Sequence, residues 1–461
     1  MTARLKEQAS ARTSALRRPP ARRGLRAAAG RLRRCVSAIV FAVLLVAFGG
    51  PAIAQGDADS LPQKAQEALQ RNDIAAAIAL LTPAAEAGSV AAQLQLAGIY
   101  HRGSGVPQDY AASVHWYTLA AHAGNAQAQN ALGASYAAGL GVPQDYAEAL
   151  RWYRMAAEQG DPRHQFDLAT MYDNGYGTPA DPAEAARWYE KAVAQGLAEA
   201  EANLGMLYLE GRGVAADPAR AFALLSSAAD KGEAKAQNNL GLMYVRGQGV
   251  VQDYEKAAAL FAKAAEQGLK PAMTNLGVMY VNGFGVPQSE TKAYDLYRRG
   301  GRAQAAGAAP DIDLEAIGAV YDSRLAPPFS GGWTVEAYEQ AAARGDTLAA
   351  FLLGYVYAVG VRVPRDYAAA ARYFRKAAAG GSVPAMTNLG LLSMRGLGTP
   401  QDFVTGYMWL NLASAGGHAE AMQLRAMLRT RMTAGQINEA QDLANRMWAR
   451  PTGAEPAGRK E

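Results

Sequence analysis

The chain has 461 residues, of which 50% are hydrophobic and 19% charged, and its formal net charge is +5. Positions 1–34 hold eleven of the 46 Lys and Arg residues but one of the 41 acidic residues, so the remainder carries 35 basic against 40 acidic side chains, a net charge of −5. An acidic remainder without a Lys/Arg stripe argues against nucleic-acid binding, and no nucleic-acid partner is expected. The single cysteine, Cys35, excludes a disulfide within one copy of the chain.

Residues 1–54 have the pattern of a secretory signal peptide. A basic region precedes an apolar stretch at 36–48, and Ala52-x-Ala54 follows as a cleavage signal. We therefore predict a mature N-terminus at Gln55, secretion across the inner membrane to the periplasm, and no membrane span after cleavage. A retained single-pass anchor is the alternative, although the apolar stretch is shorter than the roughly 20 residues that a span needs. The Arg pair at 33–34 leaves a twin-arginine signal open, and the true translation start could lie downstream of residue 1.

A tyrosine recurs through most of the remaining chain with a fixed spacing of 36 residues. It stands at Tyr100, Tyr136, Tyr172, Tyr208, Tyr244 and Tyr280, then after a slip of five at Tyr321 and Tyr357. A period of this length indicates a stack of identical supersecondary units. A Leu or Ile lies four residues before each tyrosine, and a Gly or Ala lies three before. These residues predict a helix, helix A, whose small residue lets a second helix approach closely.

The second half of each repeat is equally regular, and the repeat around 128–160 illustrates it. Gly139 and Gly141 form a Gly-x-Gly loop whose first glycine ends helix A. Asp145 is placed to cap a second helix, helix B. Helix B carries a small residue, Ala149, and a bulky one four positions later, Tyr153. One repeat is thus predicted to be two short antiparallel helices.

The pattern A-x-x-x-L-G-x-x-Y-x-x-G-x-G-V-x-x-D-Y-x-x-A-x-x-W-Y-x-x-A-A-x-x-G at 128–160 resembles the Sel1-like repeat, a relative of the tetratricopeptide repeat. Nine copies cover roughly 89–417, and the segments 407–412 and 432–441 are similar to the closing segment of many bacterial Sel1-like proteins. The resemblance implies an all-α fold, a right-handed α/α superhelical solenoid of 36-residue helix-turn-helix repeats. It implies a protein-binding scaffold and no reaction.

The repeat register predicts the domain organisation. After the signal peptide at 1–54, an N-terminal helical cap is expected at 55–88 and six regular repeats at 89–299. An irregular insertion and three further repeats follow at 300–417, then a C-terminal helical cap at 418–450 and a disordered tail at 451–461. The slip near 300–310 and the loop containing Pro327-Pro328 predict a kink or hinge between blocks ending near Arg299 and starting near Asp311. Phe329 and Trp333 in that loop are expected either to dock a partner or to pack on the next repeat.

Residues suited to chemistry are sparse, so no catalytic, cofactor-binding or metal site is predicted. The Gly-x-Gly loops lack the preceding strand and the following Lys-Ser/Thr of a phosphate loop. His115 and His122 lie seven apart on one helix, about 10 Å from one another, too far to share a metal without a carboxylate. The paired cysteines of relatives suggested to be hydrolases are missing, which makes a cryptic hydrolase the least favoured function.

An asparagine five residues before the tyrosine recurs in several repeats and forms a row across helices A. By resemblance to tetratricopeptide solenoids, helix A lines the concave surface, where such a row can hold a peptide's backbone amides and carbonyls. Polar residues one position earlier and apolar residues two before the tyrosine would line the same groove. The predicted partner-binding residues are Asn203, Asn239, Asn275, Asn388, Asn238, Thr274, Met206, Leu242, Val278 and Tyr355. A purely structural role is the alternative, in which the asparagines bond the neighbouring repeat and the apolar residues pack in the core.

The sequence thus favours a non-catalytic interaction scaffold of the bacterial cell envelope that binds a protein or peptide in the concave groove of the solenoid. Regulation or assembly of an envelope process is the corresponding role. The alternative is an envelope structural factor that binds polysaccharide or peptidoglycan through aromatic residues. Its candidates are Trp116, Trp152, Trp188 and Trp409. The sequence does not define an oligomeric state.

Overall fold

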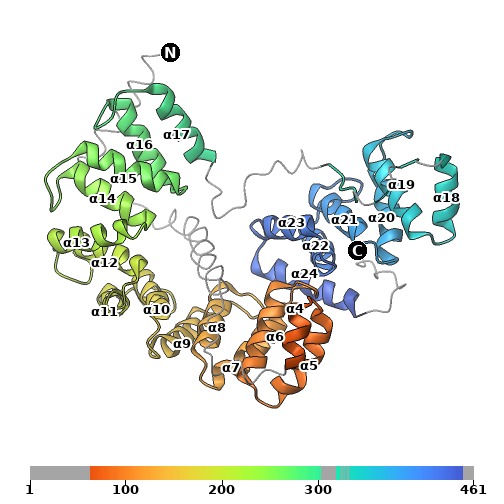
Figure 1. The fold of residues 1–461 in the computed structure, drawn as a ribbon, viewed down its shortest axis with the longest axis horizontal. Helices are drawn as coiled ribbons and strands as arrows, with labels where there is room; N and C mark the ends of the chain where they lie inside the picture. The colour runs from red at the N-terminus through yellow and green to blue at the C-terminus, as the bar shows by residue number, and fades with distance from the viewer. Residues whose placement is uncertain (1–62, 303–317, 323–324, 326–327, 330–331, 450–461) are drawn as a thin grey trace. The chain divides into compact units, whose positions relative to one another are not determined.

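A computed structural model describes residues 63–302, 318–322, 325, 328–329 and 332–449. The described residues belong to one compact unit and contain α-helices α4 to α24 without any strand. The predictions for the signal peptide, the insertion around 303–317 and the tail fall outside these residues. Within them the protein is an all-α solenoid, as the sequence predicts (Figure 1).

Most helices form pairs in which helix A is followed by helix B. The pairs are α6 (Val90–Arg102) and α7 (Tyr110–His122), α8 (Ala126–Ala138) and α9 (Tyr146–Ala157), α10 (Pro162–Asn174) and α11 (Pro182–Val193), α12 (Ala198–Glu210) and α13 (Pro218–Asp230), α14 (Ala234–Arg246) and α15 (Tyr254–Glu266), α16 (Lys270–Asn282) and α17 (Glu290–Arg302), α19 (Thr347–Val359) and α20 (Tyr367–Ala379), and α21 (Val383–Arg395) and α22 (Phe403–Ala415). The remaining helices are α4 (Gln63–Gln70), α5 (Ile74–Glu86), α18 (Val335–Ala343), α23 (Ala419–Arg429) and α24 (Ala434–Trp448).

The helix ends confirm the local predictions. The side chain of Asp145 accepts hydrogen bonds from the backbone of Ala147 and Glu148 at the start of α9, and six other aspartates cap their B helices in the same way. At the end of α8, Gly139 adopts a left-handed conformation with φ of 69°. Capping of the orphan N–H groups and a left-handed glycine together fix where each helix begins and ends.

Packing of helix A on helix B also follows the predicted pairing of small and bulky residues. A Cβ atom at Gly241 would lie 2.7 Å from the ring of Phe261, and one at Gly205 would lie 2.9 Å from Leu225. The bulky residue of helix B therefore fills the space that the missing side chain of helix A leaves. Phe261, Leu225 and Phe374 at this position are almost fully buried and form the core of the stack, whereas Tyr297 in α17 is 38% exposed.

The second glycine of each Gly-x-Gly loop has a separate role between repeats. A Cβ atom at Gly249 would lie 2.5 Å from the carbonyl oxygen of Pro218, the first residue of the preceding helix B. Gly285 meets the same backbone position at Tyr254. The loop of one repeat thus rests directly on the start of helix B in the repeat before it, and only glycine leaves the room.

The repeat around Tyr321 departs from the prediction. Its spacing predicts a helix A that includes Gly318 and Tyr321, yet residues 318–322 are not helical. The helix B of this repeat differs too: α18 has 9 residues and begins at Val335, whereas the other B helices have 12 or 13 residues. Tyr338 keeps the bulky position, seven residues before Gly345, but the small position four residues earlier is Thr334, which is only the N-cap of α18. Helix B therefore lacks its first turn here, and an added Cβ atom at Gly318 would meet nothing within 4 Å. The helix A prediction is therefore wrong at 318–322, the part of it that the structure describes.

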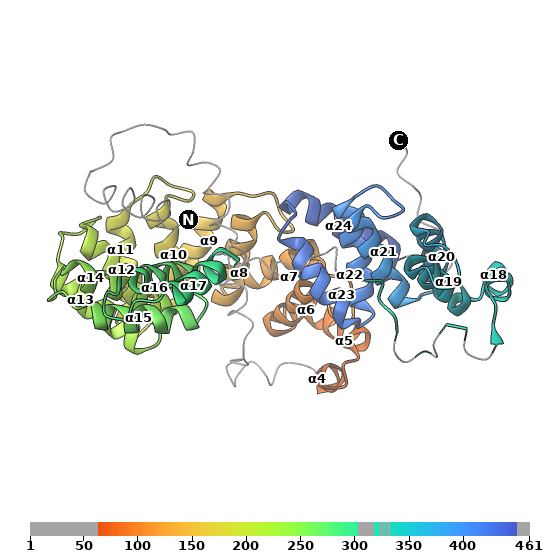
Figure 2. The same cartoon turned by 90° about the horizontal axis from the view of Figure 1, so that it is seen from above.

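The C-terminal helices pack against the loops of the first two repeats, and α24 lies beside α7 in both views (Figures 1 and 2). Asn411 of α22 binds the backbone of Gln108 with both atoms of its amide. The Gln108 N–H donates to Asn411 Oδ1 at 2.7 Å, and Asn411 Nδ2 donates to the Gln108 carbonyl at 3.0 Å. Asn438 of α24 likewise accepts from the N–H of Gly141 and donates to the carbonyl of Gly139, both at 3.0 Å.

These contacts are buried and joined by apolar packing. Asn411 is fully buried, and Tyr407 donates its hydroxyl to Gln108 Oε1 at 2.6 Å. Tyr110 and Leu140 from the first two repeats share one apolar cluster with Tyr407 and the C-terminal cap. Polar groups buried in this way must keep their partners, so the joint has one defined geometry.

Candidate functional site

The row of predicted groove residues on helices A is referred to below as the helix-A face, meaning the ten residues predicted above to bind a partner. Its best-defined part is Asn388 in α21. The N–H of Val320 donates to Asn388 Oδ1 at 2.8 Å, and Asn388 Nδ2 donates to the Val320 carbonyl at 2.8 Å. Asn388 Nδ2 also donates to the carbonyl of Pro384 at 3.0 Å, one turn earlier in its own helix. This third bond holds the amide in the orientation that binds the backbone.

Residues 318–322, which we call the bound segment, are extended at Val320. In a helix the N–H and C=O of one residue point in opposite directions along the axis, whereas in an extended chain both point to the same side. One side chain can therefore reach both groups of Val320 only if the backbone is extended there. Asn388 binds main-chain groups that every residue except proline carries.

An aromatic pocket holds the next side chain of the bound segment. The ring of Tyr321 lies 4.7 Å from that of Tyr355 and 6.1 Å from that of Phe351, between centroids, and both partners belong to α19. Burial raises the pKa of the Tyr321 phenol, and the nearby Tyr338 adds to this effect. A neutral phenol against two aromatic rings is favoured by both area burial and ring geometry.

The asparagines of the regular repeats are arranged differently. Asn203 donates to the hydroxyl of Tyr189 at 2.9 Å. Asn238 Nδ2 donates to Asn239 Oδ1 at 3.2 Å, and Asn275 Nδ2 donates to Asn238 Oδ1 at 2.9 Å, which links two adjacent repeats. Across the described part of the chain, no hydrogen bond engages Asn239 Nδ2 or Asn275 Oδ1. Both side chains are half-buried, so the chain of amides presents a donor and an acceptor at its two ends.

The other predicted residues vary in exposure. Thr274 is exposed and Val278 is 43% exposed, whereas Met206, Leu242 and Tyr355 are half-buried. Asn388 is only 1% exposed because the bound segment covers it. The structure thus brings Asn388 and Tyr355 together around one peptide segment.

Sequence reasoning missed Phe351 and the bound segment itself. A signal was present in the sequence, because Gly331 and Gly332 stand where the first turn of helix B is expected, before α18 begins at Val335. Phe329, which lies between the bound segment and α18 in the chain, is buried. The guanidinium carbon of Arg362 lies 4.3 Å from the centre of the Phe329 ring. Arg362 stands where other repeats have their second loop glycine and keeps a positive φ of 62°. Phe329 therefore packs on the next repeat, while Trp333 stacks on Tyr338 and stays 42% exposed.

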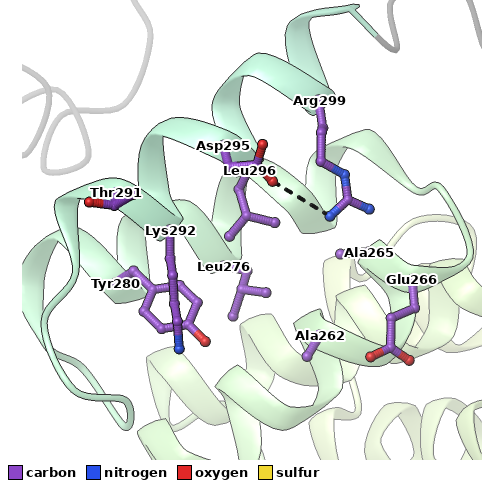
Figure 3. Close-up of a pocket in the computed structure, with 10 residues that line it drawn as sticks. All are labelled: Ala262, Ala265, Glu266, Leu276, Tyr280, Thr291, Lys292, Asp295, Leu296 and Arg299. Carbon is purple, nitrogen blue, oxygen red and sulfur yellow. Dashed lines mark ion pairs between the residues drawn. The ribbon is translucent and has the colours of Figure 1, made fainter.

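A separate pocket of about 380 Å³ lies among α15, α16 and α17 (Figure 3). Leu276 and Leu296 form an apolar side, and Arg299 reaches across it to Asp295 at 3.9 Å. The Lys292 ammonium lies 5.1 Å from the centre of the Tyr280 ring. No predicted partner-binding residue lines this pocket.

The two histidines of α7 pack against tryptophan rings. His115 contacts Trp116, and His122 contacts Trp152. No group of three or more His, Cys, Asp or Glu side chains in the described part of the chain could hold a metal ion. None of the described helices combines the length and apolar character required to cross a bilayer.

Comparison with known proteins places the fold in a family. The family model described as "Sel1 repeat" matches nine segments, at 66–89, 90–125, 126–161, 165–197, 198–233, 234–269, 270–304, 347–382 and 383–418. None of the nine covers 305–346, a range that includes the non-helical residues 318–322. The chain therefore belongs to the Sel1 repeat family, whose members are generally non-enzymatic scaffolds for protein interactions.

Two solved structures are similar to this chain in sequence. A protective antigen of uropathogenic Escherichia coli with an SLR fold is 31% identical, with 84% of this chain and 92% of that chain covered and a TM-score of 0.45. A Sel1 repeat protein from Oxalobacter formigenes is 29% identical over 52% of this chain and 97% of its own, with a TM-score of 0.47. A search of functionally curated proteins found no match.

Proposed function

We propose that this protein is a non-catalytic scaffold of the bacterial cell envelope that binds a protein or peptide partner along its helix-A face. One observation carries the proposal: Asn388, predicted as a groove residue, holds the backbone of Val320 with both atoms of its amide. The same two-bond contact recurs where Asn411 binds Gln108. Asparagine on a helix of this solenoid is thus suited to bind main-chain groups without regard to sequence.

The regular repeats would supply the rest of the binding surface. Asn239 Nδ2 and Asn275 Oδ1 offer a donor and an acceptor one repeat apart, and the exposed Val278 and half-buried Leu242 lie near them on the same helices. A preformed row of this kind binds without first having to be ordered, which favours affinity. Specificity would come from the side chains that flank the row.

Glycan binding through tryptophan is less well supported. Trp116, Trp152, Trp188 and Trp409 are all between 6% and 9% exposed, so their rings are not available to stack on a sugar. Trp188 is further engaged by a hydrogen bond from its Nε1 to Glu184 at 2.9 Å. The envelope location itself depends on the signal peptide pattern at 1–54 and is part of the proposal.

Site-specific crosslinking would test this proposal. A photoreactive residue replaces Leu242 on the helix-A face, and in a matched control it replaces Val251, a loop residue that is 85% exposed. Both proteins are illuminated in envelope extract, and a parallel sample is incubated with purified peptidoglycan. We expect a protein adduct at 242, none at 251, and no retention by peptidoglycan. Equal adducts at both positions, or retention by peptidoglycan without an adduct, would contradict the proposal.

A further inference from the structure

We infer that α19 and α21 form a second peptide-binding site with its own resident ligand, the bound segment at 318–322, and that a partner peptide must displace this segment. The inference rests on the proposed function, because it assigns a ligand class and a form of self-inhibition to one end of the helix-A face. The ligand class is an extended peptide in which a small apolar residue is followed by an aromatic one.

The contacts of the bound segment define this preference. Asn388 binds the N–H and C=O of Val320, so that position must be extended and cannot be proline. The following side chain enters the space between Tyr355 and Phe351, which suits an aromatic ring. Val320 itself packs on the apolar cluster that includes Leu391. A backbone pair with adjoining side-chain pockets is the usual basis of extended-peptide recognition.

The bound segment is not a regular part of the solenoid. In the other pairs helix A packs on a helix B of 12 or 13 residues, but α18 has 9 and begins only after Thr334, which holds the small position. The segment therefore gains little from forming helix A and lies across α19 and α21 instead. Its residues remain accessible, since Gly318 is exposed and Ala319, Val320, Tyr321 and Asp322 are half-buried.

Displacement in this arrangement is a competition between two peptides for one site. A segment tethered to its own site acts at an effective concentration of about millimolar for short flexible tethers, so a free peptide with the same contacts competes poorly. Loss of the Tyr321 ring from the tethered copy should shift the balance toward the free peptide. The site would then respond to partners that bind it better than 318–322 does.

Fluorescence anisotropy with the purified exported protein would test this inference. The probe is a labelled peptide with the sequence of residues 317–325, and a second probe carries an N-methyl group on its valine, which removes the N–H that donates to Asn388. We expect the first probe to bind Tyr321→Ala at least tenfold more tightly than wild type. The N-methyl probe should bind the same variant about fivefold to tenfold more weakly, as loss of one neutral hydrogen bond implies. Adding Asn388→Ala to Tyr321→Ala should abolish the difference between the probes.

Asn282→Ala in the Tyr321→Ala background is the matched control, because Asn282 is an exposed helix-A asparagine outside the helix-A face whose amide donates to the Val278 carbonyl in its own helix. It should leave both affinities unchanged. Equal binding of the probe to wild type and Tyr321→Ala, or equal binding of the two probes, would overturn the inference.

Hydrogen exchange on unmodified protein covers the case in which a variant fails to fold. Saturating unlabelled peptide should accelerate exchange at 318–322, and unchanged exchange would also overturn the inference. Crosslinking at Leu242 is independent of these measurements, so the resident-ligand inference can fail while the scaffold function stands, and the reverse also holds.

Discussion

The contact between each Gly-x-Gly loop and the preceding repeat leads to a prediction about stability. Gly232 and Gly249 both have positive φ, of 93° and 69°. A Cβ atom at Gly232 would have nothing within 4 Å, whereas one at Gly249 would lie 2.5 Å from the Pro218 carbonyl oxygen and 2.8 Å from its carbon. Replacement of each glycine by alanine therefore separates conformational strain from steric contact between repeats.

The expected magnitudes follow from these two terms. Gly232→Ala should cost about 1–2 kcal/mol, the strain of a left-handed alanine. Gly249→Ala carries a similar strain and must also push the loop away from backbone that cannot rotate aside, which adds about 1–3 kcal/mol of overpacking. The melting temperature of Gly249→Ala should thus lie below that of Gly232→Ala by roughly 1–4 °C for a chain of several hundred residues.

Thermal unfolding followed by circular dichroism at 222 nm would measure the difference, with hydrogen exchange at the start of α13 as a local probe. We expect faster exchange there in Gly249→Ala alone. Equal melting temperatures for the two variants would refute the view that the second loop glycine is required for close contact between repeats.

Three other predictions concern charge, the C-terminal joint and export. Burial raises the pKa of Asp167 to about 7, partly offset by a hydrogen bond from Asn130, so the folded state holds a proton that the unfolded chain has lost. The free energy of unfolding should therefore fall by roughly 1 kcal/mol per pH unit as pH rises from about 4 to 7. Denaturation curves of Asp167→Asn should lack this pH dependence. An unchanged pH dependence would exclude Asp167 as its source. Asn411→Ala leaves the N–H and C=O of Gln108 without their partner, which should lower the free energy of unfolding by about 2–4 kcal/mol. Hydrogen exchange in α24 should be faster in this variant. Unaltered exchange would show that the joint between the C-terminal helices and the first repeats does not depend on this amide. Mass spectrometry of the exported protein should find an N-terminus at Gln55, and retention of residues 2–50 would refute the signal peptide.

Much of the fold could be predicted because each repeat carries its own local signals. Asp145 at a helix start, Gly139 at a helix end and the Gly241–Phe261 pair each act within one repeat, and a period of 36 residues multiplies such signals. The second glycine of the loop is visible as a pattern in the sequence, but its reason is not. That reason is a contact with the backbone of the previous repeat, which only the stacked arrangement reveals.

The candidate site could be predicted in part. Asn388 and Tyr355 follow from their repeat position, and both contact the bound segment. The spacing of Tyr321 assigns the segment itself to a helix, because Tyr338 keeps its regular repeat position and only the late start of α18, at Val335, sets this repeat apart. Contacts between Asn411 and Gln108 join residues 303 apart in sequence, and no local pattern encodes such a pairing.

The central claim is that asparagines of the helix-A face bind the main chain of a partner. The most direct measurement is the affinity of the partner crosslinked at Leu242 for wild type and for the double variant Asn239→Ala, Asn275→Ala, with melting temperatures taken on the same samples. Loss of two hydrogen bonds of about 1 kcal/mol each to the partner predicts an affinity roughly thirtyfold weaker. A small fall in the melting temperature is expected as well, because both substitutions remove hydrogen bonds to the buried Asn238. A folded double variant that binds the partner with wild-type affinity, or one whose melting temperature falls by several degrees without a specific loss of binding, would contradict the account.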